Sequence, residues 1–195
     1  YSSAASDVYK RQLGALGKGI ACDELYEIIS GSSVTGACVS VGGSILVYGK
    51  KPGNGSEDTE FKVGIKNPRV DDDDTENMCG ILSIDSPEKP VYVSTSGDYE
   101  KYFIKDGRRY HHILNPKTGY PADTGIISAT VVCDSGAVSD ALSTVCILMG
   151  REDAMKVLKK YNAEAIMIDK DKQVYITDGL VDKFTIKDNN YKVVE

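Results

Sequence analysis

Two side chains suited to metal binding lie four residues apart in the C-terminal half of the chain. Asp140 and Thr144 fall in the stretch Ser-Asp-Ala-Leu-Ser-Thr, within a run of helical hydrophobic spacing. Residues four apart project from one helix face, so their oxygens can meet at one cation. Carboxylate and hydroxyl oxygens suit Mg²⁺, which takes further ligands from water and substrate phosphates. On these two residues alone, the alternative is an exposed acid beside a helix-interior threonine.

His111 and His112 are the only histidines of the chain. Neighbouring residues on a strand point to opposite faces, so the two rings cannot both serve one site. An imidazole that titrates near neutrality can accept the proton of an attacking hydroxyl. A partly buried, hydrogen-bonding histidine is the alternative. The following segment, 115–119, is a good β-turn on local grounds, because Pro116 fixes φ and Gly119 accepts positive φ.

A glycine-rich bend at residues 13–19 directly precedes a predicted helix. Its glycines expose backbone N–H groups, and a helix N-terminus favours anions, so the bend can hold a phosphate. The bend is not a P-loop, because the G-x-x-x-x-G-K-[ST] spacing is absent. A plain turn is the alternative.

Composition limits the function classes that this chain can belong to. With 195 residues, 41% hydrophobic and 27% charged, it is long enough for one domain with a substantial core. A formal charge of −6 argues against nucleic acid as a partner. No apolar run approaches the roughly 18–20 residues of a membrane span, and no signal sequence is visible, so we expect a soluble fragment. The five cysteines lack disulfide or zinc spacing and are expected to be small buried hydrophobes.

Hydrophobic periodicity predicts an α+β fold of mixed and antiparallel sheets with packed helices, because hairpins and helices occur without regular βαβ alternation. Predicted helices cover residues 20–29, 137–149 and 152–161. The first predicted strand, 37–48, is interrupted by Gly42 and Gly43, and Asp106-Gly107 forms a later hairpin turn. Further strands are predicted at 61–65, 78–84, 91–94, 99–104, 110–114, 126–133, 165–169 and 173–176. The acidic run at 71–74 is interpreted as a solvated loop.

In order and approximate spacing, these blocks resemble the ApbE family of flavin transferases. The stretch from His112, His-Ile-Leu-Asn-Pro-Lys-Thr-Gly, is similar to the family signature His-Ile-x-(Asp/Asn)-Pro-x-Thr-Gly. The stretch Ser-Thr-Ser-Gly-Asp-Tyr at 94–99 and the helix around Asp140 also match. The resemblance covers about residues 13–179 and implies an ApbE-like, T-fold-like α+β domain.

The resemblance also assigns site residues. It makes His112 the catalytic residue and gives Asp140, Thr144 and the main-chain carbonyl of Ala15 to a magnesium ion. It implies main-chain contacts to the flavin near Leu114. Leu114 and Thr118 both belong to the signature that begins at His112. The cofactor-binding residues that we expect are Lys18, Gly42, Gly43, Leu114 and Thr118. Ser44, which follows Gly42 and Gly43, stands where the family commonly has Asp or Asn. The chain departs from the family pattern at this position.

The activity that the resemblance implies is magnesium-dependent transfer of FMN from FAD to a threonine of an acceptor flavoprotein, with release of AMP. The expected acceptor is a membrane-associated electron-transfer subunit, and the full-length family member is expected outside the cytoplasm, anchored to a membrane. Two alternatives stay open on the sequence. One is an FAD pyrophosphatase that gives FMN and AMP, and the other is a non-catalytic FAD-binding module.

Residues 1–12 match nothing in the resemblance and are expected to be an unrelated leader. The domain is then expected to comprise residues 13–195 and to represent the C-terminal, motif-bearing part of an ApbE-like protein. In this family the glycine-rich bend follows an acidic residue and a whole N-terminal portion, whereas Gln12 stands at that junction here. We therefore expect the upstream part of the site to be missing.

Overall fold

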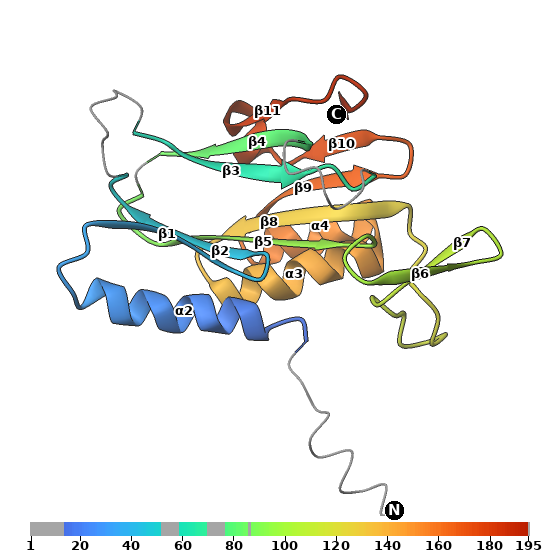
Figure 1. Ribbon diagram of the computed structural model, residues 1–195, viewed down its shortest axis with the longest axis horizontal. Coiled ribbons are helices and arrows are strands. Elements are labelled where there is room, and N and C mark those ends of the chain that lie inside the picture. Colours follow the sequence, from blue (N-terminus) through green and yellow to red (C-terminus); the bar gives the residue numbers. More distant parts are fainter. Residues whose placement is uncertain (1–13, 52–58, 70–76, 86, 195) are drawn as a thin grey trace, which may run out of the picture.

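A seven-stranded sheet forms the middle layer of the computed structural model, which describes residues 14–51, 59–69, 77–85 and 87–194 (Figure 1). All neighbouring strands of this sheet run antiparallel except β10 and β12. In spatial order the strands are β1 (Gly36–Val41), β2 (Ser44–Gly49), β5 (Val91–Gly97), β8 (Ile126–Cys133), β9 (Glu164–Asp169), β10 (Gln173–Ile176) and β12 (Lys192–Val194).

The two faces of this sheet are covered by different elements (Figure 1). Helices α2 (Gly17–Ser30), α3 (Gly136–Met149) and α4 (Arg151–Lys160) pack on one face. A three-stranded sheet of β11 (Phe184–Ile186), β4 (Met78–Ile84) and β3 (Phe61–Lys66) packs on the other, and the 3₁₀ helix η1 (Asp178–Lys183) precedes β11. The hairpin β6 (Tyr102–Lys105) and β7 (Arg108–His111) extends from one end.

The core has separate apolar clusters above and below the sheet. Side chains of β3 and β4 meet those of β9 and β10 in one cluster, and α3 and α4 pack against β8 and β9 in another. A smaller cluster places Cys22 of α2 against Leu46 and Tyr92 of the sheet. Because β8 is central and covered on both faces, nearly all of its residues are buried, including the polar Ser128 and Thr130.

The α+β prediction is confirmed, and most predicted elements are present within a few residues of their expected bounds. The predicted strand at 37–48 is a hairpin instead, with Gly42 and Gly43 in its two-residue turn at φ values of 53° and 94°. The strand predicted at 110–114 ends at His111, and the one predicted from Tyr99 begins only at Tyr102. The acidic run at 71–74 and residues 1–12 lie outside the described residues.

The cysteines follow the prediction with one exception. Four of them are buried, whereas Cys38 on the edge strand β1 is exposed, so the expectation of burial was wrong there. All five thiols are free. Burial raises the pKa of both Cys79 and Cys146 to about 12, which keeps these two thiols protonated and unreactive.

Helices α2 and α3 cross in backbone contact at a pair of glycines. A Cβ on Gly19 would lie 2.0 Å from the carbonyl oxygen of Gly136, and one on Gly136 would lie 2.3 Å from that of Gly19. Near this crossing, the Asp23 carboxylate of α2 accepts hydrogen bonds from the N–H groups of Gly136 and Ala137, at 2.7 and 2.8 Å. A carboxylate at a helix N-terminus satisfies unpaired N–H groups and the helix dipole. The start of α2 is thus fixed against α3.

We expect Gly19→Ala to lower the thermal unfolding midpoint by several degrees, while Gly17→Ala leaves it equal or slightly higher. The first methyl group has no space against the backbone of α3, and overpacking of this kind costs about 1–3 kcal/mol. The second methyl group meets nothing within 4 Å and improves helix propensity. Circular dichroism melts of both variants provide the test. Equal midpoints would show that the two helices are not in backbone contact.

Candidate functional site

The described residues enclose a cavity of about 440 Å³ at the start of α2, beside the β1–β2 turn and the C-terminal end of β5. Five of the predicted site residues line it: Lys18, Gly42, Gly43, His112 and Thr144. They come from four separate parts of the chain, which only the fold brings together. Gly14 of the predicted phosphate-binding bend also lines it, and the lining residues that the sequence did not single out for chemistry are Ile45, Val63, Gly64, Lys66, Thr95, Ser96, Gly97, Tyr99, Glu100 and Lys101.

Asp140 lies behind this cavity in a buried position on α3. Only 1% of its surface is exposed. One carboxylate oxygen is 2.9 Å from Lys18 Nζ, and the other accepts the backbone N–H of Gly19 at 3.1 Å. The helix crossing at Gly19 therefore holds the acid against the start of α2. Since the Lys18 side chain also lines the cavity, the buried negative charge is linked to the cavity through that ammonium group.

Thr144 lies one turn after Asp140, as the spacing predicted, and belongs to a group of hydroxyls between α3 and β5. Ser96 Oγ is 3.1 Å from Thr144 Oγ1 and 2.7 Å from Ser143 Oγ. Ser143 Oγ in turn donates to the main-chain carbonyl of Asp140 at 2.8 Å. The sequence assigned no chemistry to Ser96, and its partner Thr144 is 48 residues away. These hydroxyls fix the orientation of α3 against β5.

The oxygens of this region have the chemistry of a hard-cation site. Asp140 is a buried anion, and the Lys18 ammonium already shows that a cation is stable beside it. The carboxylate and the Thr144 hydroxyl fit the ligand types that magnesium takes. Ala15, the third predicted ligand, is half-buried in the turn before α2, and its neighbour Gly14 lines the cavity. Within the described part of the chain, no three His, Cys, Asp or Glu side chains form a metal cluster. Of the three predicted magnesium ligands, Asp140 alone belongs to these residue types.

His112 and His111 occupy different environments, as predicted, but the reason differs. His112 lies just beyond the end of β7, and its backbone N–H donates to the Lys101 carbonyl at 3.0 Å. His112 is exposed and lines the cavity, whereas His111 is only 8% exposed and lies outside it. Desolvation by the surrounding protein lowers the pKa of His112 and outweighs a backbone hydrogen bond to Lys101, which raises it. A neutral imidazole able to accept a proton is therefore favoured.

Leu114 and Thr118 do not line the cavity. Leu114 is 51% exposed and forms an isolated bridge with Pro121. Thr118 lies in the turn, where its hydroxyl accepts the N–H of Tyr120 at 3.3 Å. Gly119 closes the turn onto the Asn115 carbonyl at 2.8 Å with φ 72°. The turn prediction is confirmed, while a flavin-binding role of Leu114 and Thr118 stays a prediction.

The sequence missed an ion pair between the residues that follow two different strands. Arg69 makes two hydrogen bonds to the Asp98 carboxylate, at 2.7 and 2.8 Å. Nothing local in the sequence identifies the partner of Asp98, which is 29 residues away. Arg69 follows β3 and Asp98 follows β5, so the ion pair connects the small sheet to the large one. Tyr99, the next residue, returns to the cavity wall, with Lys66 Nζ 5.7 Å from its ring centre.

The fold and the site define a mixed-sheet α+β domain whose cavity opens beside a glycine-rich helix start, where backbone N–H groups favour anions. The sequence model of the ApbE family matches residues 6–167. The chain belongs to the ApbE family. The matched range includes part of the segment 1–12.

Curated relatives and solved structures agree with this family. A Treponema pallidum protein named FAD:protein FMN transferase is 32% identical over 184 residues, which cover 92% of this chain and 49% of the relative. An Escherichia coli K12 protein of the same name is 29% identical over 160 residues, 82% of this chain and 42% of the relative. The crystal structure of the Thermotoga maritima ApbE protein has a TM-score of 0.69 and 32% identity, covering 86% of this chain and 51% of that one. The apo flavinyl transferase ApbE of Pseudomonas stutzeri has a TM-score of 0.61 and 27% identity, covering 80% and 45%.

The chain spans about half the length of these relatives. Among the described residues, no helix is both long and apolar enough to cross a membrane.

Proposed function

We propose that this chain carries out magnesium-dependent transfer of FMN from FAD to a threonine hydroxyl of an acceptor flavoprotein, releasing AMP. The observation that carries the proposal is the 440 Å³ cavity, which places His112, Lys18 and Thr144 on its walls with Asp140 buried behind. The names of the relatives, FAD:protein FMN transferase, support the substrate and the reaction class.

In the proposed reaction, the acceptor threonine oxygen forms a bond to the FMN phosphorus of FAD, and the pyrophosphate bond to that phosphorus breaks. AMP leaves with the electron pair of the broken bond, and His112 takes the threonine proton. Lys18 and the N–H groups at the start of α2 contact phosphate oxygens, because this helix begins without a side-chain cap. Gly42 and Gly43 allow the β1–β2 turn to approach the cofactor without side chains.

Asp140, Thr144 and the Ala15 carbonyl would hold the magnesium ion. When bound, the ion neutralises negative charge on the pyrophosphate and the leaving AMP. Asp140 supplies the only carboxylate of this set, so its burial and its bond to Gly19 fix where that charge lies. Lys18, which pairs with the carboxylate and lines the cavity, would then be released to contact the phosphates.

The acceptor that we propose is a membrane-associated electron-transfer subunit, and we place the full-length protein outside the cytoplasm, anchored to a membrane. Both proposals rest on the family. Leu114 and Thr118 contact the flavin from outside the cavity in this proposal.

Incubating the chain with FAD and Mg²⁺, with and without a candidate threonine-bearing acceptor, tests the function. Transfer predicts AMP by chromatography and fluorescent flavin that stays on the denatured acceptor. FMN and AMP without an acceptor would instead show an FAD pyrophosphatase, and FAD binding without either product would show a binding module. No FAD binding in any condition would contradict all three.

We expect the acid limb of the pH profile for kcat/KM to have its midpoint below 6.5, the ordinary value for histidine. His112 acts in its neutral form, so activity is lost as the pH falls through its pKa, and desolvation moves that pKa downward. Initial rates from pH 5 to 8 at low FAD provide the measurement. A midpoint above 6.5, or a limb that persists in His112→Ala, would assign the titration to another group.

A further inference from the structure

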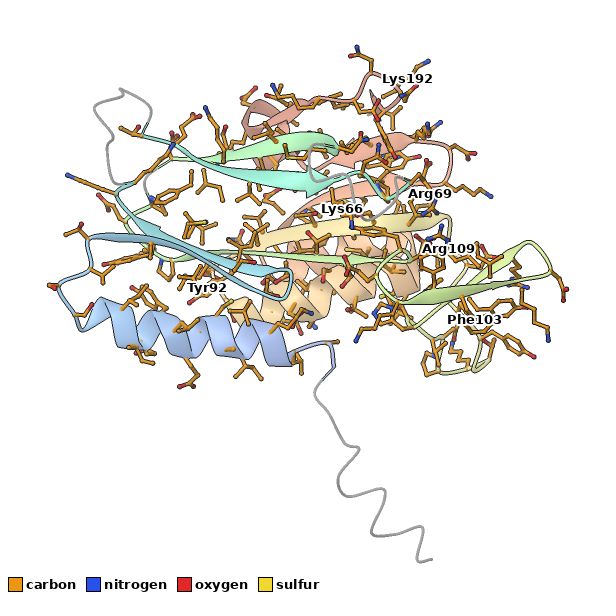
Figure 2. The ribbon with its side chains drawn as sticks, in the orientation of Figure 1. Lys66, Arg69, Tyr92, Phe103, Arg109 and Lys192 are labelled. Carbon is orange, nitrogen blue, oxygen red and sulfur yellow. The ribbon has the colours of Figure 1, made fainter. Side chains whose placement is uncertain are left out.

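A second cavity, of about 210 Å³, lies where the β6–β7 hairpin meets the segment that leads into β8. It shares no described lining residue with the larger cavity. Its walls carry the basic side chains of Arg69, Arg108, Arg109 and Lys170 but only two carboxylates, Asp98 and Asp123. Figure 2 shows Arg69 and Arg109 at the same end of the molecule, where the hairpin leaves the sheets. An acidic chain thus has a cationic cavity at this point.

The basic groups differ in how far their charge is already balanced. Arg69 is held by Asp98 through two hydrogen bonds, and Arg108 is 3.8 Å from Asp123. Arg109 has no carboxylate within 4.0 Å in the described parts of the chain, and its guanidinium is stacked 3.8 Å from the centre of the Tyr102 ring. Its charge is therefore positioned but not neutralised.

Two buried polar atoms of this cavity's lining residues have no hydrogen-bond partner among the described residues. They are Arg109 Nη1 and His111 Nδ1. The two residues are two apart on β7, so their side chains lie on the same face of the hairpin. Buried polar groups are nearly always satisfied by protein, water or a ligand, so these two atoms are available to a molecule bound in the cavity.

The hydrogen-bond roles of these two atoms define the ligand. Arg109 Nη1 can only donate. His111 Nε2 lies 3.0 Å from the Ala122 carbonyl, which can only accept, so Nε2 carries the hydrogen. In the neutral ring Nδ1 is then an acceptor. A matching ligand needs an anionic oxygen for Arg109 and a hydroxyl hydrogen for His111.

We propose that this cavity binds a small oxyanion that retains one hydroxyl group, of the hydrogen phosphate class. Its charged oxygens accept from Arg109, and its hydroxyl donates to His111 Nδ1. Lys170 and Arg108 add positive charge to the same walls. Hydrogen phosphate and bicarbonate share this chemistry. Hydrogen phosphate has the larger negative charge and therefore makes the stronger charge-assisted hydrogen bonds to the Arg109 guanidinium.

The hydroxyl requirement separates this site from a general anion site. Sulfate is similar in size but has no hydrogen at neutral pH. A phosphomonoester loses its second proton near pH 6, so at pH 8 it also lacks a donor, while inorganic phosphate keeps one. A site built around a substrate hydroxyl rejects analogues without it strongly. We expect sulfate and methyl phosphate to bind at least about 100-fold more weakly than phosphate at pH 8.

The two histidines provide a direct readout. A ¹H–¹³C NMR spectrum of the ring Cε1–H groups contains two signals, and the one that persists in His112→Ala belongs to His111. Titrations at pH 8 and constant ionic strength compare phosphate, bicarbonate, sulfate and methyl phosphate. We expect the His111 signal to shift and saturate with phosphate while the His112 signal stays in place. The bicarbonate titration shows which of the two hydroxyl-bearing anions binds more tightly.

Arg109→Gln should remove the His111 response to phosphate. Lys105→Gln is the matched control, because it removes one exposed positive charge from the same hairpin without touching the cavity. Unfolding midpoints without phosphate show whether Arg109→Gln is folded, and the anion series on the unmodified chain is decisive if it is not. A sulfate response equal to that of phosphate, or no His111 response to any anion, would overturn the proposal.

Discussion

Asp140→Asn is expected to abolish magnesium-dependent turnover, with a loss of roughly 10³-fold or more. A bound metal stabilises transition-state charge by several kcal/mol, and each 1.4 kcal/mol or so corresponds to a factor of ten in rate. Asparagine keeps the shape of the side chain and an oxygen for the Gly19 N–H, but it removes the charge that faces Lys18. Alanine would also leave a gap at a buried helix contact, so asparagine tests the charge more cleanly.

The measurement is AMP release at saturating FAD over a range of magnesium concentrations, together with the unfolding midpoint. Asp153→Asn is the matched control, since it removes one carboxylate from the exposed face of α4, where Asp153 pairs with Lys156. We expect the control to retain full activity. Full activity of Asp140→Asn at low magnesium would refute the metal assignment.

His112→Ala is expected to lower the turnover rate about 10² to 10⁴-fold, the usual contribution of a positioned general base. His112 lines the cavity and is exposed, so its removal should leave the unfolding midpoint nearly unchanged. His111→Ala should behave in the opposite way. It removes a buried ring and its hydrogen bond to the Ala122 carbonyl, so stability falls and turnover changes far less.

Steady-state rates and thermal midpoints of both variants, measured side by side, separate these roles. Because the two residues are adjacent and chemically identical, each variant is the control for the other. If both variants lose the same fraction of activity at temperatures where both are folded, the general base is a different group.

Local sequence patterns determined most elements of this fold. Helix α3 was predicted almost to its ends because its apolar spacing is helical and a glycine, Gly150, follows it. In the structure Gly150 has φ 75°, which favours glycine. Strand β8 was predicted at its observed bounds from its β-branched residues. These signals depend on residues close together in the sequence, so they can be recognised without tertiary information. The motif at His112 and the four-residue spacing of Asp140 and Thr144 are local in the same sense.

Only the tertiary structure decided which of these groups meet. Asp140 and Lys18 are 122 residues apart, and their contact depends on the close crossing of α2 and α3. The Asp98 ion pair with Arg69, the hydroxyl bridge from Ser96 to Thr144, and the unsatisfied atoms of Arg109 and His111 likewise arise from strand order and helix placement. Periodicity fixes which face of an element is apolar, but the partner of a polar side chain depends on long-range packing, which no local pattern contains.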